Sequence, residues 1–178
     1  IAEFRPRALE AGVSAATFDA AMRGVEFSEK VVERDRNQNE FSKTIWDYLD
    51  TAVSEDRVAL GLKAIARNRA LLERIEAEYG VEKEVVAAVW GLESAYGTYR
   101  GDLPVLGSLA TLAYEGRRGA FFEKELIAAL KIVQGGHVER FDGSWAGASG
   151  HTQFMPSSWE RFAVDFDGDG KKNLWGDD

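Results

Sequence analysis

Glu93 lies where a carboxyl group is costly, near the C-terminal end of a predicted helix that is otherwise almost entirely apolar. Desolvation and the negative end of the helix dipole both favour the protonated form of such a group. A general acid that works near neutral pH needs that form. An exposed glutamate at a fraying helix end, or one neutralised by an arginine, is the competing interpretation. Tyr96 is expected on the same helix face, where core packing is a commoner role than sugar contact.

A glycine-rich loop over residues 143–150, continuing to Ser158, is a second candidate site. Its glycines allow the backbone to approach a ligand or another segment closely. The side chains of Gln153 and of the loop serines offer neutral hydrogen bonds, the type that holds sugar hydroxyls. A tight structural turn packed with core aromatics explains the same pattern.

Three aspartates alternate near the end of the chain and occupy positions 1, 3 and 5 of an EF-hand-like calcium loop: Asp165, Asp167 and Asp169. Gly170 follows at the sharp turn, and Lys171 can contribute its backbone carbonyl. Position 12, where the standard loop has a bidentate Glu, is Gly176. We expect a calcium ion that stiffens this loop and takes no part in chemistry. The alternative is an acidic, solvated turn.

Arg117 and Arg118 are a weaker candidate site, just before the pair Phe121 and Phe122. Arginine side chains form forked hydrogen bonds with carboxylates, such as the acids of a peptide-bearing polymer. Surface arginines at a helix start, or a structural ion pair, are equally consistent with the sequence.

Charge and composition exclude several functional classes. The 178 residues carry a net charge of −8 without a separate basic cluster, which excludes a nucleic-acid partner. No apolar run approaches the roughly 18 residues of a membrane span. The absence of Cys excludes disulfides and thiol catalysis, and His137 and His151 lack the spacing of a catalytic zinc site. Residue 1 is not Met, so we expect a removed leader or a start inside the gene product.

Hydrophobic spacing predicts a mainly α-helical chain. The predicted helices cover residues 3–11, 14–23, 46–53, 54–79, 82–95, 105–114, 118–134 and 158–163. Ser14 and Ser54 are expected N-caps, and Gly80 and Gly97 are expected helix ends. Residues 26–45 are charged and show little periodicity.

The sequence also predicts how three of these helices are buried or capped. The helix over 82–95 is apolar on nearly all sides, which predicts a buried central helix. The spacing Ser157-x-x-Glu160 predicts a capping box. The expected buried face of the helix over 118–134 consists of Phe121, Phe122, Leu126, Ala129, Leu130 and Ile132.

Four motifs occur in one order along the chain: GLESAYG, LATLAYEGRR, GSWAGASGHTQFMPSSW and AVDFDGDGKKNLW. This series resembles the membrane-bound lytic murein transglycosylase B family, whose core is similar to goose-type lysozyme. With FSKTIWDYLD and the predicted helix after it, the resemblance covers nearly the whole chain. It implies a mainly α fold with an N-terminal helical lobe over residues 1–80, a lysozyme-like core over 81–163 and a calcium-binding loop subdomain over 164–178.

The resemblance implies cleavage of the β-1,4 bond between N-acetylmuramic acid and N-acetylglucosamine in peptidoglycan, without water. One Glu protonates the glycosidic oxygen and then takes a proton from the C6 hydroxyl of the muramoyl residue, which closes on C1. The product has a 1,6-anhydro end, and the two-carboxylate arrangement of most glycosidases is not required. A muramidase that uses the same Glu with water, or a non-catalytic peptidoglycan-binding protein, is the alternative.

Residue by residue, Glu93 matches the catalytic acid/base of the family. Ser144 and Gln153 match polar residues of its cleft, Phe154 an aromatic of its sugar-binding floor, and Arg117 with Arg118 a pair that meets muropeptide acids. Tyr96 is a further substrate-binding candidate. The matching calcium ligands are Asp165, Asp167, Asp169 and the carbonyl of Lys171.

Two features depart from the family pattern. Ser149 stands where the family often has Met, and the sequence stops before the family's C-terminal segment, which should supply the last calcium carboxylate. The resemblance further implies a monomer that acts on peptidoglycan strands in the periplasm. It leaves open an outer-membrane anchor through a lipidated N-terminus.

Overall fold

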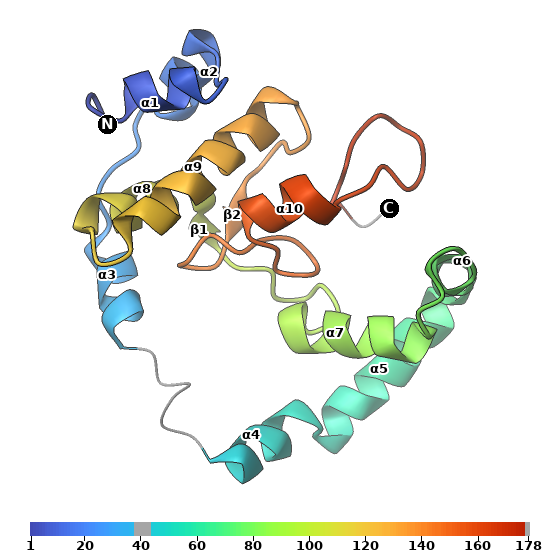
Figure 1. Ribbon diagram of the computed structural model, residues 1–178. Coiled ribbons are helices and arrows are strands. Elements are labelled where there is room, and N and C mark those ends of the chain that lie inside the picture. Colours follow the sequence, from blue (N-terminus) through green and yellow to red (C-terminus); the bar gives the residue numbers. More distant parts are fainter. Residues whose placement is uncertain (38–43, 177–178) are drawn as a thin grey trace. The chain divides into compact units, whose positions relative to one another are not determined.

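The computed structural model describes residues 1–37 and 44–176, which form ten helices and one two-stranded antiparallel sheet (Figure 1). The helices are α1 (Arg5–Glu10), α2 (Ala15–Ala21), α3 (Glu29–Arg36), α4 (Ile45–Ala52), α5 (Glu55–Arg67), α6 (Arg69–Tyr79), α7 (Lys83–Ser94), α8 (Val105–Glu115), α9 (Gly119–Gln134) and α10 (Pro156–Phe162). The strands are β1 (Leu103–Pro104) and β2 (Asp142–Gly143), with Leu103 opposite Gly143. The expected mainly α fold is confirmed.

The chain divides into two compact units, Ile1–Asn37 with Gly101–Asp178, and Gln38–Arg100. The expected boundary between residues 80 and 81 lies inside the second unit, because α7 packs on both α5 and α6. Within the described residues, no helix combines the length and the apolar character that a membrane crossing needs.

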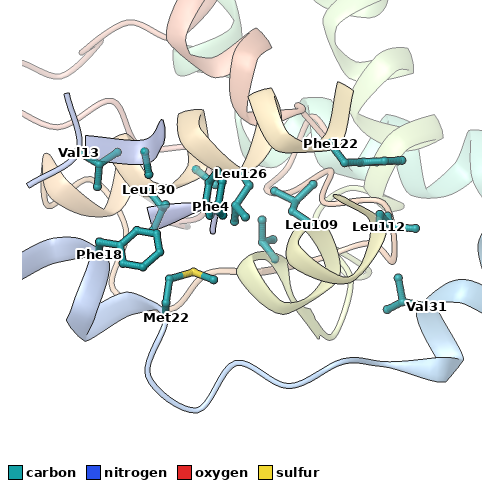
Figure 2. Close-up of a cluster of buried hydrophobic side chains, with 13 residues drawn as sticks. Phe4, Val13, Phe18, Met22, Val31, Leu109, Leu112, Phe122, Leu126 and Leu130 are labelled. Atoms are coloured by element: carbon teal, nitrogen blue, oxygen red, sulfur yellow. The ribbon is translucent and has the colours of Figure 1, made fainter. Parts of the chain in front are cut away.

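The first unit is built around α8 and α9, which pack against each other, and the hydrophobic spacing predicts both helices. Figure 2 shows its core, where Leu109 and Leu112 of α8 meet Phe122, Leu126 and Leu130 of α9. Side chains of the N-terminal helices and their flanks close this core: Phe4, Ala8, Val13, Phe18, Met22 and Val31. The expected buried position of Phe121 is wrong, since its side chain is 46% exposed.

Helix α3 lies in the stretch for which the sequence shows little periodicity. Ser28 caps it by accepting a hydrogen bond from the backbone N–H of Val31. Its buried residues are Val31 and Asp35, four positions apart on one face. Because one of the two is charged, the hydrophobic spacing does not reveal the helix. Residues 38–43 of this stretch lie outside the described residues.

The second unit contains α4 to α7. The single helix expected over residues 54–79 is wrong, because the chain breaks at Asn68 into α5 and α6. The Asn68 side chain donates a hydrogen bond to the carbonyl of Ala64 over 2.9 Å, which competes with continuation of the helix. The predicted ends are confirmed: the Ser54 side chain caps α5, and Gly80 terminates α6 in the left-handed conformation.

The expectation of a fully buried helix at α7 is wrong. Its buried residues are Ala87, Gly91 and Ser94, which form one narrow stripe, while Val85 and Val89 are exposed. The small side chains of this stripe allow α7 to approach α5 and α6 closely.

The predicted capping box at Ser157 is also wrong. Helix α10 begins two residues earlier than predicted, at Pro156, whose fixed φ suits the first helical position. The backbone N–H and the hydroxyl of Ser157 instead donate to the carboxylate of Glu125 on α9, over 2.9 and 2.6 Å. The start of α10 is thus held by a side chain of another helix.

Candidate active site

Glu93 is one residue from the C-terminal end of α7, as the sequence predicts, but its side chain is exposed. The expectation of a carboxyl group desolvated by apolar neighbours is wrong. The physical reason is that burial on α7 follows Ala87, Gly91 and Ser94, and Glu93 lies off this stripe. The chemical feature that remains is a carboxyl group in the last turn of a helix, open to an approaching ligand.

The chain leaves α7 through a left-handed turn directly after Ser94. Ala95 and Tyr96 have positive φ angles of 49° and 57°, which residues other than glycine seldom adopt. The buried Ser94 hydroxyl donates to the carbonyl of Trp90 over 3.3 Å and accepts from the N–H of Gly97 over 3.0 Å. Ala95, not the predicted Gly97, therefore takes the first left-handed position after the helix.

Tyr96 does not share a helix face with Glu93, because it lies beyond the end of α7. Its ring packs edge-on against Trp90 with centroids 5.7 Å apart. Its hydroxyl donates to the carbonyl of Arg57 on α5 over 3.1 Å. These contacts match the core-packing alternative.

Arg57 is a residue that the sequence patterns do not single out. Its Nη1 donates to the carbonyl of Gly91, two residues before Glu93, over 2.7 Å. In the sequence it is one charged residue among several at the start of α5, directly after Glu55 and Asp56. No local signal distinguishes it from a solvated arginine.

In the first unit, the loop from Gly143 is a tight turn held by its own backbone. The N–H of Ser144 donates to the carbonyl of Ala148 over 2.7 Å. The Ser144 hydroxyl accepts from the N–H groups of Ala146 and Ala148 over 3.3 and 3.1 Å. A hydroxyl in this role retains its own hydrogen for donation to a ligand.

Gln153 and Phe154 follow in the same loop. The backbones of Phe154 and Ser149 exchange two hydrogen bonds of 3.0 Å each, and Ser149 is buried. Gln153 adopts a positive φ of 49°, and its side-chain amide donates to the carbonyl of Gly150 over 3.0 Å. The side chains of both Gln153 and Phe154 are partly exposed, so this turn presents an amide and an aromatic ring at its surface.

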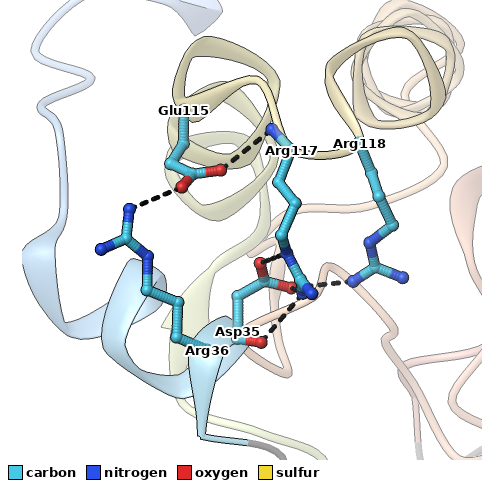
Figure 3. A network of polar contacts seen from close by, with 5 residues as sticks. All are labelled: Asp35, Arg36, Glu115, Arg117 and Arg118. Atoms are coloured by element: carbon cyan, nitrogen blue, oxygen red, sulfur yellow. Dashed lines mark hydrogen bonds and ion pairs between the residues drawn. The ribbon is translucent and has the colours of Figure 1, made fainter.

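Arg117 and Arg118 both bind the buried carboxylate of Asp35 (Figure 3). Arg117 donates from Nε to Oδ2 over 2.8 Å and from Nη2 to the Asp35 carbonyl over 2.9 Å. Arg118 donates from Nη2 to Oδ1 over 2.8 Å, and its guanidinium lies 4.8 Å from the ring centre of Phe122. This arrangement matches the ion-pair alternative, although both arginines are about half exposed.

The pKa of Asp35 is affected by two opposing influences. Burial raises it, and the hydrogen bonds and positive charges of Arg117 and Arg118 outweigh burial and lower it below its ordinary value. Beside this pair, Glu115 accepts from Nη2 of Arg36 over 2.8 Å and from the N–H of Arg117 over 3.0 Å. Asp35 therefore remains an anion and orders the arginine pair.

The three loop aspartates converge. Asp165, Asp167 and Asp169 each offer a carboxylate oxygen within 4.8 Å of the other two, a donor set and spacing that fit a hard cation such as calcium. Asp165 accepts from the N–H groups of Gly168 and Gly170 over 2.8 and 3.0 Å. Partial desolvation raises the pKa of Asp165, but these backbone hydrogen bonds outweigh it and lower the pKa.

The segment after these aspartates is tied to the rest of the first unit. The indole N–H of Trp159 on α10 donates to the carbonyl of Lys172 over 2.8 Å, and the Lys172 N–H donates to Nδ1 of His137 over 3.3 Å. The N–H of His151 donates to the carbonyl of Leu174 over 2.9 Å. The His137 ring and the His151 backbone thus tie this segment to the rest of the unit.

The structure groups the predicted site residues in four places. Glu93 and Tyr96 lie at the end of α7 in the second unit, while Ser144, Gln153 and Phe154 share one loop in the first. The other two groups also belong to the first unit: the arginine pair on Asp35, and the aspartate loop with Lys171.

Comparison with known proteins gives concordant results. The chain is 36% identical over 131 residues to the membrane-bound lytic murein transglycosylase B of Escherichia coli, which covers 72% of this chain and 36% of the relative. The structure of SltB3 from Pseudomonas aeruginosa in complex with NAG-NAM-pentapeptide matches with a TM-score of 0.94 and 48% identity, over 98% of this chain and 47% of that chain.

The Escherichia coli lytic transglycosylase Slt35 in complex with calcium matches with a TM-score of 0.86 and 29% identity, over 97% of this chain and 56% of that chain. The chain thus spans about a third of the length of its curated relative and about half of the solved structures. The family model of the transglycosylase SLT domain matches residues 1–178. The chain therefore belongs to the transglycosylase SLT domain family.

Proposed function

We propose that this protein is a peptidoglycan lytic transglycosylase with Glu93 as its single acid/base. The observation that carries the proposal is an exposed carboxyl group at the end of α7, within a chain that matches the SLT family model throughout. The related SltB3 has been solved with NAG-NAM-pentapeptide and with NAG-anhNAM-pentapeptide, at 48% identity in both cases. The anhydro compound in the second complex supports a non-hydrolytic reaction over the hydrolysis that a muramidase catalyses.

In the proposed reaction, the Glu93 carboxyl group donates its proton to the glycosidic oxygen as the bond from that oxygen to C1 of the muramoyl residue breaks. The resulting carboxylate takes the proton of the C6 hydroxyl, and the C6 oxygen forms a bond to C1. Glu93 ends the cycle protonated, and no water is consumed. The substrate supplies the nucleophile, so one carboxyl group suffices.

The loop residues and the arginine pair are proposed to bind the glycan and its peptide. The Ser144 hydroxyl and the Gln153 amide offer neutral hydrogen bonds to sugar groups, and the Phe154 ring offers an apolar face. The exposed parts of Arg117 and Arg118 can bind peptide acids while Asp35 holds them. Tyr96 is proposed to pack within the second unit and not to bind substrate, because its hydroxyl donates to the Arg57 carbonyl.

Calcium is proposed as a structural ion, bound by Asp165, Asp167, Asp169 and the Lys171 carbonyl. The converging carboxylates support this assignment, and so does the calcium complex of Slt35. An ion there would stiffen the segment that reaches Trp159 and His151 through the hydrogen bonds described above.

We expect a monomer that acts on peptidoglycan strands in the periplasm, and an outer-membrane lipid anchor would agree with the name of the Escherichia coli relative.

Mass spectrometry of digested peptidoglycan tests the proposed reaction. We expect anhydro-muramic ends, which are lighter than hydrolysed ends by the mass of one water. Glu93→Gln should abolish product formation and retain binding to peptidoglycan. This result would exclude the alternative of a non-catalytic peptidoglycan-binding protein. Glu84→Gln, at the exposed opposite end of α7, is the matched control and should remain active. Reducing ends alone would establish a muramidase, and full activity of Glu93→Gln would overturn the site assignment.

A further inference from the structure

The geometry points to Arg57 as a positioning residue that holds the last turn of α7, and with it the direction of Glu93. This inference rests on the proposed function of Glu93. Arg57 lies at the start of α5, 34 residues before Gly91, and its Nη1 donates to the Gly91 carbonyl over 2.7 Å. That carbonyl belongs to the last turn of α7, and the last turn of a helix tends to fray.

The Gly91 carbonyl serves two donors at once. It accepts from the N–H of Ala95 over 3.1 Å, the bond that closes the final turn around Glu93, and from the Arg57 guanidinium. A cation is also the favourable charge at the negative end of a helix. The Arg57 contact therefore stabilises the turn that contains Glu93 in two ways, by a hydrogen bond and by its charge.

Tyr96 connects the same two helices from the other direction. Its hydroxyl donates to the Arg57 carbonyl over 3.1 Å, so Arg57 accepts from the segment after Glu93 and donates to the segment before it. The Tyr96 ring occupies space that only glycines leave open: a Cβ added at Gly61 or at Gly91 would lie 2.5 Å from its hydroxyl oxygen. The arrangement is thus built around this tyrosine.

The turn needs such support because its backbone is unfavourable. Ala95 and Tyr96 both occupy the left-handed region, with φ of 49° and 57°. Residues other than glycine persist there when the surroundings hold them. The contacts of Arg57, Tyr96 and Ser94 all act on the residues that flank Glu93, and none of those described acts on its carboxyl group.

An alternative role for Arg57 is direct contact with the substrate. Arg57 and Leu92 border a cavity of ≈ 570 Å³ that is lined by residues of α4 and its N-cap. Loss of a substrate contact would raise KM, whereas loss of positioning lowers kcat, because a catalytic group displaced by about 1 Å can lose roughly 100-fold in rate. The two roles are therefore separable by kinetics.

The test compares Arg57→Ala, Arg57→Lys and Tyr96→Phe in the full chain, with Arg67→Ala as the control on the exposed end of the same helix. Rates are measured on soluble GlcNAc–MurNAc peptide oligomers, beside thermal unfolding. We expect kcat of Arg57→Ala to fall roughly 100-fold with KM little changed. Arg57→Lys, which keeps a cationic donor, should recover about a tenth or more of the lost rate, and millimolar guanidinium should partly restore Arg57→Ala. Tyr96→Phe should show a smaller loss of kcat.

Three results would overturn the inference. The first is a kcat for Arg57→Ala equal to that of Arg67→Ala. The second is a raised KM with unchanged kcat, which assigns Arg57 to substrate contact. The third is a rate loss that neither lysine nor guanidinium restores and that follows the loss of folded protein. If Glu93→Gln remains active, the proposed function fails first and this inference falls with it; if only Arg57→Ala remains active, the inference alone fails.

Discussion

The carboxylate of Asp35, which is only 2% exposed, is held by the guanidinium of Arg117, 82 residues further along the chain. Arg118 donates to the other oxygen of the same carboxylate. Two cations thus share one buried anion, and the group keeps a surplus positive charge on the exposed side of the arginines. This relationship fixes α3 to the start of α9 and orders a pair of donors that we assign to peptide acids.

Asp35→Asn should therefore destabilise the protein. The change leaves two arginines without their anion, at a cost of roughly 2 kcal/mol, because their half-exposed heads can recover some hydration. Urea unfolding at neutral pH measures this loss. Asp19→Asn, which removes an exposed partner of Arg5, is the matched control and should change the midpoint little.

The loss of stability in Asp35→Asn should depend on pH. The pKa of Asp35 is lowered in the folded state, so the stability from its ionisation is fully present above the ordinary aspartate pKa. It is lost as the pH falls through the lower, folded-state pKa. The gap in unfolding free energy between wild type and Asp35→Asn should therefore narrow only in strongly acidic solution. A gap that stays unchanged throughout that strongly acidic range would contradict the ion pair.

Calcium should raise the thermal midpoint through the aspartate loop. Binding to the folded state alone adds about 2.7 kcal/mol when calcium is at 100 times its Kd. Gly176 occupies position 12, so we expect weak binding, with a Kd nearer to millimolar than to micromolar. Differential scanning calorimetry with calcium and with chelator measures the shift.

Asp169→Asn should remove most of this calcium response, since it neutralises one of the three converging carboxylates. Lys171→Ala is the matched control, because only the backbone carbonyl of that residue is assigned to the ion. Equal calcium shifts in Asp169→Asn and wild type would rule out this loop as the site.

The fold could be predicted from the sequence where local signals agreed with packing. Helices α8 and α9 follow from apolar spacing, and the caps at Ser14 and Ser54 from residue type. The break at Asn68 could not be predicted from the spacing. The apolar positions miss one step beside Asn68 and then continue, as they also can in a single uninterrupted helix. Helix α3 was not predicted, because one of its two buried residues, Asp35, is charged and does not contribute to the hydrophobic spacing.

The site was less predictable, for a physical reason. Motif order indicates Glu93 and the loop of Gln153, but the partners that hold them come from distant segments. Arg57 is 34 residues from Gly91, and Ser157 is 32 residues from Glu125. A single sequence contains no local signal for such pairs. It also placed Glu93 among apolar side chains, because all-round hydrophobicity of a helix does not specify which stripe is buried.

Glu125→Ala should be among the more destabilising single changes in α9. The carboxylate is 3% exposed and accepts both the N–H and the hydroxyl of Ser157. Removing it leaves two donors at the start of α10 without their partner and a small cavity, at a cost of about 3 kcal/mol. Ser157→Ala keeps the N–H bond and should cost less, about 1 kcal/mol.

A double-mutant cycle separates the Glu125–Ser157 contact from the cavity. The double variant should be more stable than the sum of the two single losses predicts, since the hydroxyl bond can be lost only once. Strict additivity, measured by urea unfolding, would show that the two side chains act independently.

Two glycines test whether the space beside α7 is filled by Tyr96. In Gly91→Ala the new Cβ would lie 2.5 Å from the Tyr96 ring, so the ring or the helix must move, at a cost of about 1–3 kcal/mol. In Gly107→Ala, inside α8, the nearest neighbour is the Cβ of Pro104 at 3.9 Å, and better helix propensity should add up to about 1 kcal/mol. The two substitutions are chemically identical, so their opposite signs would isolate the effect of space. Because the Tyr96 ring supports the turn after Glu93, Gly91→Ala should also lose more activity than its stability explains. A Gly91→Ala protein as stable and as active as Gly107→Ala would mean that Tyr96 is not held between α5 and α7.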